Sequence, residues 1–85
     1  MSYRIEFRPA ARRGMRRLPR DVIQRIDRHI LSLADDPRPH GVERLTGEEN
    51  TYRIRVGDYR VLYEIHDDVL IVYVIRVGHR RDVYR

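Results

Sequence analysis

The feature that most constrains the fold is a change in hydrophobic period, from helical spacing over residues 10–34 to alternation from residue 51 onward. Residues 51–56 alternate apolar and polar side chains, residues 59–65 do so except at Leu62, and Gly57-Asp58 between them is a tight-turn signal. A period of two predicts strands that bury one face, so these segments form a β-hairpin. Residues 69–75 are all apolar or aromatic, which is typical of a central strand.

The first third of the chain predicts one strand and two helices. Residues 3–7 alternate apolar and charged side chains, and Pro9 ends this strand and starts a short, basic helix. Pro19 starts a second helix, in which residues 22–34 carry one apolar stripe. We therefore expect a single α+β domain over residues 1–85 with the order β-α-α-β-β-β, an antiparallel sheet with a helical hairpin packed on one face.

The alternation also predicts which side chains the sheet leaves uncovered. Arg53 and Arg55 lie opposite the apolar set of their strand, and Arg60 lies opposite the apolar set of the next strand. If the apolar sets face the helices, these three arginines emerge together on the open face of the sheet.

Composition excludes several classes of protein. The 85 residues contain no cysteine, so disulfides and thiolate metal sites are excluded, and the four histidines lack the spacing of metal ligands. No segment approaches the ~18 uninterrupted apolar residues of a membrane span. Residues 1–10 do not resemble a signal peptide. We therefore expect a cytoplasmic protein without a metal and without a membrane partner.

The positive charge of the chain is unevenly distributed. A formal net charge of +5 arises from eighteen arginines and no lysine. Residues 1–34 hold nine arginines against three acidic residues, whereas residues 35–50 hold two against five. Segregated positive charge favours an acidic or polyanionic partner such as nucleic acid. The arginine content alone is equally compatible with a GC-rich genome.

The sequence lacks the usual signatures of nucleophilic and nucleotide-dependent enzymes. Ser2 and Ser32 are the only serines, and no glycine-rich phosphate loop occurs. The adjacent acid pairs fall in predicted turns, where solvated caps are commoner than metal sites. What remains is a set of basic and aromatic residues on the hairpin and after the last strand: Arg53, Arg55, Arg60, His79, Arg80, Arg81 and Tyr84.

This set fits cleavage of RNA without a metal ion. The RNA 2′-hydroxyl can attack the neighbouring phosphate, so the protein has to stabilise negative charge, accept the 2′ proton and protonate the leaving 5′-oxygen. Arginine suits the first task, and a histidine, tyrosine or glutamate suits the others. The alternative is a solvated outer face, on which the arginines pair with Glu64 or Asp82 while Tyr84 packs on the core.

Two segments, LTGEENTYRIRVGDYRVLYEI and VIRVGHRRDVYR, resemble the RelE/ParE superfamily of type II toxin–antitoxin toxins, most closely its RelE branch. The resemblance spans essentially the whole chain. It implies cleavage of messenger RNA in the ribosomal A site, without metal or cofactor, through a 2′,3′-cyclic phosphate. By motif, Arg53 and Arg55 match strand positions that engage the RNA backbone. Arg60 matches the arginine that stabilises transition-state charge, Arg80 a phosphate contact, and Tyr84 the tyrosine that stacks on or orients a nucleotide.

The chain departs from the family pattern where a proton acceptor is expected. The best-studied pattern has lysines at the positions of Arg53 and Arg55, and arginine is a poorer proton acceptor. The resemblance offers two substitutes. His79 follows the Val-Gly turn, and histidine titrates near neutral pH; Glu43 matches a glutamate that acts as base in the YoeB-like branch. Gly78 is expected to permit a turn that aims His79, with the residues after it, at the open face.

The resemblance also implies partners. An acidic, RelB-like antitoxin would wrap the basic surface in a toxin–antitoxin hetero-oligomer, and the target would be the ribosome with its mRNA. Two alternatives stay open: a ParE-like toxin that binds DNA gyrase and cuts no RNA, and a degenerate member that serves only as an antitoxin-binding repressor component. The presence of Arg60, Arg80 and Tyr84 on one chain favours the nuclease.

Overall fold

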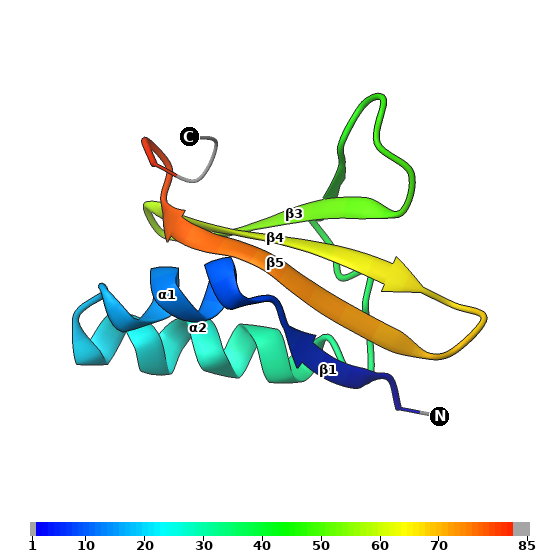
Figure 1. Ribbon diagram of the computed structural model, residues 1–85, viewed down its shortest axis with the longest axis horizontal. Helices are drawn as coiled ribbons and strands as arrows, with labels where there is room; N and C mark the ends of the chain where they lie inside the picture. Colours follow the sequence, from blue (N-terminus) through cyan, green and yellow to red (C-terminus); the bar gives the residue numbers. More distant parts are fainter. Residues whose placement is uncertain (1, 83–85) are drawn as a thin grey trace.

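The computed structural model describes residues 2–82. It consists of two layers, one of helices and one of strands. Two helices, α1 (Pro9–Arg16) and α2 (Arg20–Ser32), lie together under one face of a single sheet (Figure 1). The strands are β1 (Arg4–Phe7), β2 (Glu43–Arg44), β3 (Thr51–Val56), β4 (Tyr59–His66) and β5 (Ile71–His79). Within residues 2–82, neither helix is long and apolar enough to cross a membrane.

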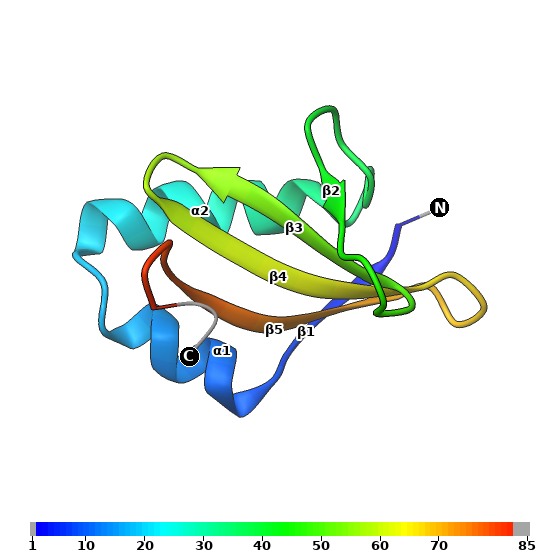
Figure 2. The same cartoon turned by 90° about the horizontal axis from the view of Figure 1, so that it is seen from above.

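The strands follow the order β1-β5-β4-β3-β2, as Figure 2 shows from above. β3, β4 and β5 form the antiparallel meander that the sequence predicts, and the α+β fold class is confirmed. The sheet is mixed rather than antiparallel throughout, because β1 pairs with β5 in parallel. β1 leads directly into α1, and both follow the same edge of β5. The two-residue strand β2 is too short to show a period in the sequence.

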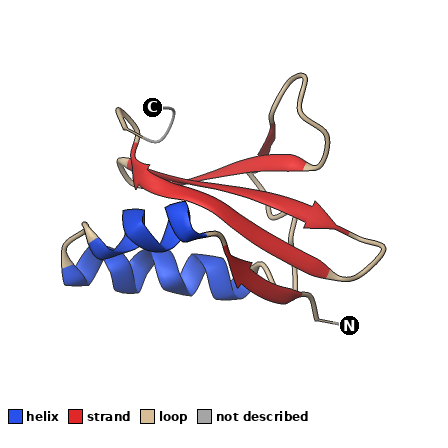
Figure 3. Ribbon diagram, viewed as in Figure 1, coloured by secondary structure: helices blue, strands red, loops and turns tan. Residues whose placement is uncertain are grey.

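The core lies between the helices and the sheet (Figure 3). Ile26 and Ile30 of the predicted apolar stripe are fully buried. They belong to one core cluster with residues of the meander: Val61, Tyr63, Ile65, Val72 and Val74. The hydroxyl of the buried Tyr63 donates a hydrogen bond of 2.7 Å to the carbonyl of Pro37, so the polar end of this large ring is satisfied.

α1 packs across the edge of β5 beyond the end of β1. Gly14 permits this contact, because a Cβ atom at its position would lie 2.0 Å from the carbonyl oxygen of Val77. Such an approach is far inside van der Waals contact, so only glycine lets the backbone of α1 come this close to the strand. The contact fixes α1 and its arginines against the C-terminal half of β5.

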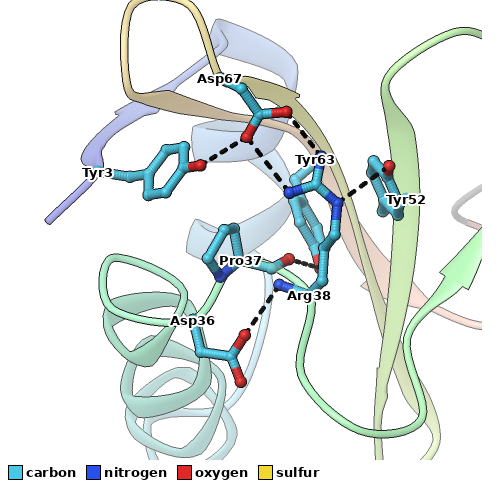
Figure 4. Close-up of polar contacts among 7 residues, drawn as sticks. All are labelled: Tyr3, Asp36, Pro37, Arg38, Tyr52, Tyr63 and Asp67. Atoms are coloured by element: carbon cyan, nitrogen blue, oxygen red, sulfur yellow. Dashed lines mark hydrogen bonds and ion pairs between the residues drawn. The ribbon is translucent and has the colours of Figure 1, made fainter. Parts of the chain in front are cut away.

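A polar cluster ties the loop after α2 to the turn between β4 and β5 (Figure 4). The guanidinium of Arg38 donates to the two carboxylate oxygens of Asp67, at 3.3 and 2.8 Å, and to the hydroxyl of Tyr52 at 3.3 Å. Tyr3 donates its hydroxyl proton to Asp67 at 2.5 Å. These hydrogen bonds, first the one from Arg38, lower the pKa of Asp67 to about 2.

Gly14→Ala should destabilise the fold. Intrinsic helix preference favours alanine over glycine by about 1 kcal/mol, so a net loss identifies the clash with Val77. Relief of that clash requires a backbone shift, for which we expect a cost of roughly 1–3 kcal/mol in the free energy of unfolding. Urea denaturation of both proteins measures it. Gly78→Ala is the control, because a Cβ atom there meets no described atom within 4 Å; equal stability of the two variants would contradict this account.

Asp67→Asn should lower the melting temperature at neutral pH and have little effect in strong acid. The folded-state pKa of Asp67 lies below its ordinary value of 3.8, so the stabilisation is complete above that value and is lost as pH falls towards about 2. Melting curves of wild type and variant are therefore expected to converge over this interval. Asp68→Asn, in the same turn, is the matched control. A constant difference at every pH would show that the Asp67 charge is not the stabilising group.

Candidate nucleic-acid interface

The open face of the sheet carries the three arginines that the alternation predicts there. Arg53 pairs with Leu62 on β4, and Arg55 pairs with Arg60. Directly paired residues project on the same face, so these arginines share the face opposite the core. Like charges directly opposite each other are destabilising. An anion bound over Arg55 and Arg60 would remove this repulsion.

β5 adds an arginine that the sequence pattern did not reveal. Val74 pairs with Tyr63 but Arg76 pairs with Leu62, so Ile75 is an extra residue that bulges from β5. Without the bulge, Arg76 would share the buried face with Val74; with it, Arg76 lies on the open face. The available signal was a single charge in an apolar run, but a hydrophobic period does not locate a bulge.

On β5 the residue that pairs with Arg60 has no side chain. This residue is Gly78, and a Cβ atom added to it would meet nothing within 4 Å apart from its chain neighbours. Arg60 thus has Arg55 on one side and a glycine on the other. β5 continues through Gly78 to His79, so the glycine lies inside the strand and not at the turn that the sequence suggests.

β2 brings the candidate carboxylate to the arginines. Glu43 pairs with Arg53 in the ladder, and its Oε2 accepts a hydrogen bond of 2.5 Å from the Arg53 guanidinium. This bond lowers the pKa of Glu43, and the charges of Arg55 and Arg60 lower it further. Glu43 is therefore ionised at neutral pH and shares one electrostatic site with three arginines.

The three candidate residues at the end of the chain, His79, Arg80 and Tyr84, do not join the arginines of the open face as one described group. His79 pairs with Tyr59, which packs against the core, and the two rings meet edge to face at 5.6 Å. His79 therefore lies on the helix side, contrary to the expectation from the motif. Arg80 donates its backbone N–H to the carbonyl of Asp58 at 2.9 Å, beside the turn between β3 and β4. Tyr84 lies outside the described residues.

The far end of the open face has its own ion pairs. Glu64 lies 3.0 Å from His66 and 4.0 Å from Arg8, and the Arg8 guanidinium stacks over the Tyr73 ring at 4.2 Å from its centroid. Among residues 2–82, Glu64 is thus paired with these groups and does not neutralise Arg60. Of the two acidic partners that the solvated-face alternative names, Glu64 is thus engaged at the other end of the sheet.

The groups of the open face suit an anion with several charged oxygens. Arginines surround Leu62 on three strands, and their planar forks match phosphate geometry. Within the part of the chain that the structure describes, no three histidine, aspartate or glutamate side chains come together as a metal site. The arrangement offers fixed positive charge beside one ionised carboxylate.

Comparison with known proteins gives consistent matches over the whole chain. The family described as the ParE toxin of type II toxin-antitoxin system, parDE, matches residues 5–84. Toxin RelG of Mycobacterium tuberculosis is 33% identical over 86 residues, which cover 100% of this chain and 99% of RelG. The mRNA interferase toxin RelE of Escherichia coli is 28% identical over 82 residues, 94% of this chain and 85% of RelE.

The fold matches a solved member of the same group. A chain of the toxin–antitoxin complex RelBE2 from Mycobacterium tuberculosis superimposes with a TM-score of 0.83 at 30% identity, over 94% of this chain and 100% of that chain. Sequence and fold therefore lead to the same group of proteins. The chain belongs to the RelE/ParE superfamily of type II toxin–antitoxin toxins and lies close to its RelE branch.

Proposed function

We propose that this toxin is a ribosome-dependent, metal-free endonuclease that cleaves mRNA in the ribosomal A site. The observation that carries the proposal is the grouping of Arg53, Arg55 and Arg60 with Glu43 on the open face of the sheet. Similarity to the mRNA interferase toxin RelE of Escherichia coli supports the same activity.

The proposed reaction begins when the 2′-hydroxyl oxygen attacks the adjacent phosphorus. A 2′,3′-cyclic phosphate forms as the bond from phosphorus to the 5′-oxygen breaks, and the leaving 5′-oxygen takes up a proton from water. Arg60 stabilises the charge that develops on the phosphoryl oxygens, and one such donor contributes about 10²–10³ in rate. Arg53 and Arg55 hold the RNA backbone. Arg80 makes a further phosphate contact, and Tyr84 orients a nucleotide.

Glu43 is better placed than His79 to accept the 2′ proton. Glu43 lies beside Arg53 on the open face, whereas His79 pairs with Tyr59 on the helix side. In the free protein the hydrogen bond from Arg53 keeps Glu43 a weak base, because it lowers the pKa of the carboxyl. An RNA phosphate that takes over the Arg53 guanidinium weakens this bond. Substrate binding would then raise the pKa of Glu43 towards a value useful for proton transfer.

The basic open face of the sheet also suggests the partners of the toxin. An acidic antitoxin that covers the basic open face would silence the toxin in a hetero-oligomer. The solved RelBE2 complex, which contains a chain similar to this one, supports an antitoxin partner. The remaining partners are the ribosome and its mRNA, and the toxin acts in the cytoplasm.

A DNA gyrase inhibitor without nuclease activity is the second candidate. The observation in its favour is that the matching family is that of the ParE toxin. Such an inhibitor has no use for a carboxylate among arginines that bind phosphate, so the arrangement around Glu43 favours the nuclease.

Arg60→Ala should lower codon-positioned cleavage of a defined message on ribosomes by about 10²–10³. The reason is loss of the charge that stabilises the pentacoordinate phosphate. Mapping the 5′ ends of the products measures the effect, and Arg80→Ala and Tyr84→Ala are tested alongside. Arg44 lies on β2 next to Glu43 but pairs with Tyr52. Arg44→Ala is therefore the control and should cleave as wild type does. Trapped gyrase–DNA complexes without mRNA cleavage by the wild type would overturn the proposal.

Glu43→Gln should lower the single-turnover cleavage rate by about 10²–10⁴ and abolish its rise with pH. Glutamine keeps the shape of the side chain but accepts no proton, so the remaining rate reports charge stabilisation alone. His79→Gln, in contrast, should leave the pH profile intact, because His79 lies on the helix side. If His79→Gln removes the pH dependence and Glu43→Gln preserves it, the proton acceptor is the histidine.

A further inference from the structure

A second basic site lies at the edge of the sheet, outside the group around Glu43. It is a cleft of about 650 Å³ between α1 and the C-terminal half of β5. Its charged lining consists of Arg13 from α1, Arg17 directly after that helix, Arg76 and His79 from β5, and Asp82 from the following turn. Three arginines and a histidine therefore face one carboxylate.

The cleft exists because β5 changes neighbours along its length. β1 pairs with β5 only as far as Val74, and α1 covers the edge beyond it. Gly14 holds the helix against Val77, which leaves Arg13 and Arg17 on the rim that faces the strand. The cleft is thus a consequence of the fold and not of a loop conformation.

The cleft is continuous with the open face of the sheet. Gly78 lines the cleft and is also the direct partner of Arg60, and Arg76 lines it while pairing with Leu62. Gly78 has no side chain, and a Cβ atom there would meet nothing within 4 Å apart from its chain neighbours, so no side chain at this position of β5 separates Arg60 from the cleft. A nucleic-acid strand bound at Arg60 can therefore continue into the cleft.

Arg13 and Arg17 have no described counter-charge. Among residues 2–82, no carboxylate forms an ion pair with Arg13 or Arg17, and both side chains are exposed. They are four residues apart, in the last turns of α1 and at its C-cap, and like charges at this helical spacing repel by about 0.2–0.5 kcal/mol. Such a pair is most stable when an anion lies against it.

We propose that this cleft is a phosphate-binding subsite that holds the backbone of the RNA strand where it leaves the arginines of the open face. The inference rests on the proposed function and extends it, since it gives the path of the substrate beyond the cleaved bond. Apart from Leu18 and Val77, the walls are small or polar. An amphipathic protein segment would find few apolar anchors there, whereas a polyphosphate backbone needs only the positive charges.

The test uses 2′-O-methyl RNA oligonucleotides of about four and about ten nucleotides, which bind without being cut. Their affinity for the intact toxin is measured by fluorescence anisotropy over a range of salt concentrations. R13Q/R17Q is compared with R16Q/R20Q, which removes the same charge from exposed positions outside the cleft. R13Q/R17Q should bind the longer RNA roughly ten-fold less tightly and reduce the slope of log K against log salt by about 1.4, that is 0.7 for each lost phosphate contact.

The shorter RNA should lose much less affinity, because it is held by the open-face arginines alone. R16Q/R20Q should weaken both lengths by less than about three-fold, the effect of net charge at a distance. If both variants behave alike, the cleft is not a subsite, while cleavage of mRNA on ribosomes by the wild type still supports the proposed function. If R13Q/R17Q loses binding of poly-glutamate but not of RNA, the cleft binds an acidic protein segment and the proposal is overturned. Absence of ribosomal cleavage by the wild type overturns the proposed function itself.

Discussion

The packing of the outer edge of β5 determines where the arginines of α1 and of the second half of β5 lie. Over its first half this edge is closed by β1 and over its second half by α1, which only Gly14 allows to approach Val77. The bulge at Ile75 separates the two halves. It keeps valines on the buried face before and after it, and it moves Arg76 to the open face. Close helix packing and a shift of register together produce one basic surface around the edge of the sheet.

The carboxylates that pair with arginines are distributed unevenly over the sheet. At the end of the sheet near the β4–β5 turn, Asp67 pairs with Arg38, and Glu64 lies against Arg8 and His66. Away from that end, Glu43 lies against Arg53, and the charges of Arg55 and Arg60 also act on it. Exposed ion pairs add little stability, so the main effect of these pairs is to hold side chains in position. The first group fixes loops to the sheet, whereas the second leaves positive charge available to an external anion.

Most of the fold was predictable because its periods are long and regular. The apolar stripe of α2 and the alternation of β3 and β4 place the core, and the same alternation places Arg53, Arg55 and Arg60 on the open face. The parallel pairing of β1 was not predictable, since a strand's period is the same in either direction.

The site was less predictable than the fold, for local reasons. Glu43 was a candidate by motif, but its contact with Arg53 depends on a two-residue strand that has no period. Arg76 and His79 lie beyond the bulge, and one inserted residue moves every later side chain to the other face. The sequence therefore identified the residue types and assigned His79 to the wrong face.

The ion pair between Glu43 and Arg53 resembles the interaction that the substrate would make. In the free toxin a carboxylate oxygen occupies a donor of Arg53, at a hydrogen-bond distance of 2.5 Å. A phosphate or an acidic antitoxin side chain would compete for that donor with the same chemistry, so the donor of Arg53 that Glu43 holds would carry an anion in either complex. Under the proposed function, a phosphate on Arg53 would free Glu43 next to the reacting 2′-hydroxyl, whereas an antitoxin carboxylate at the same donor would offer no bond to cleave. Inhibition would then need no conformational change and no site separate from the one proposed to bind RNA.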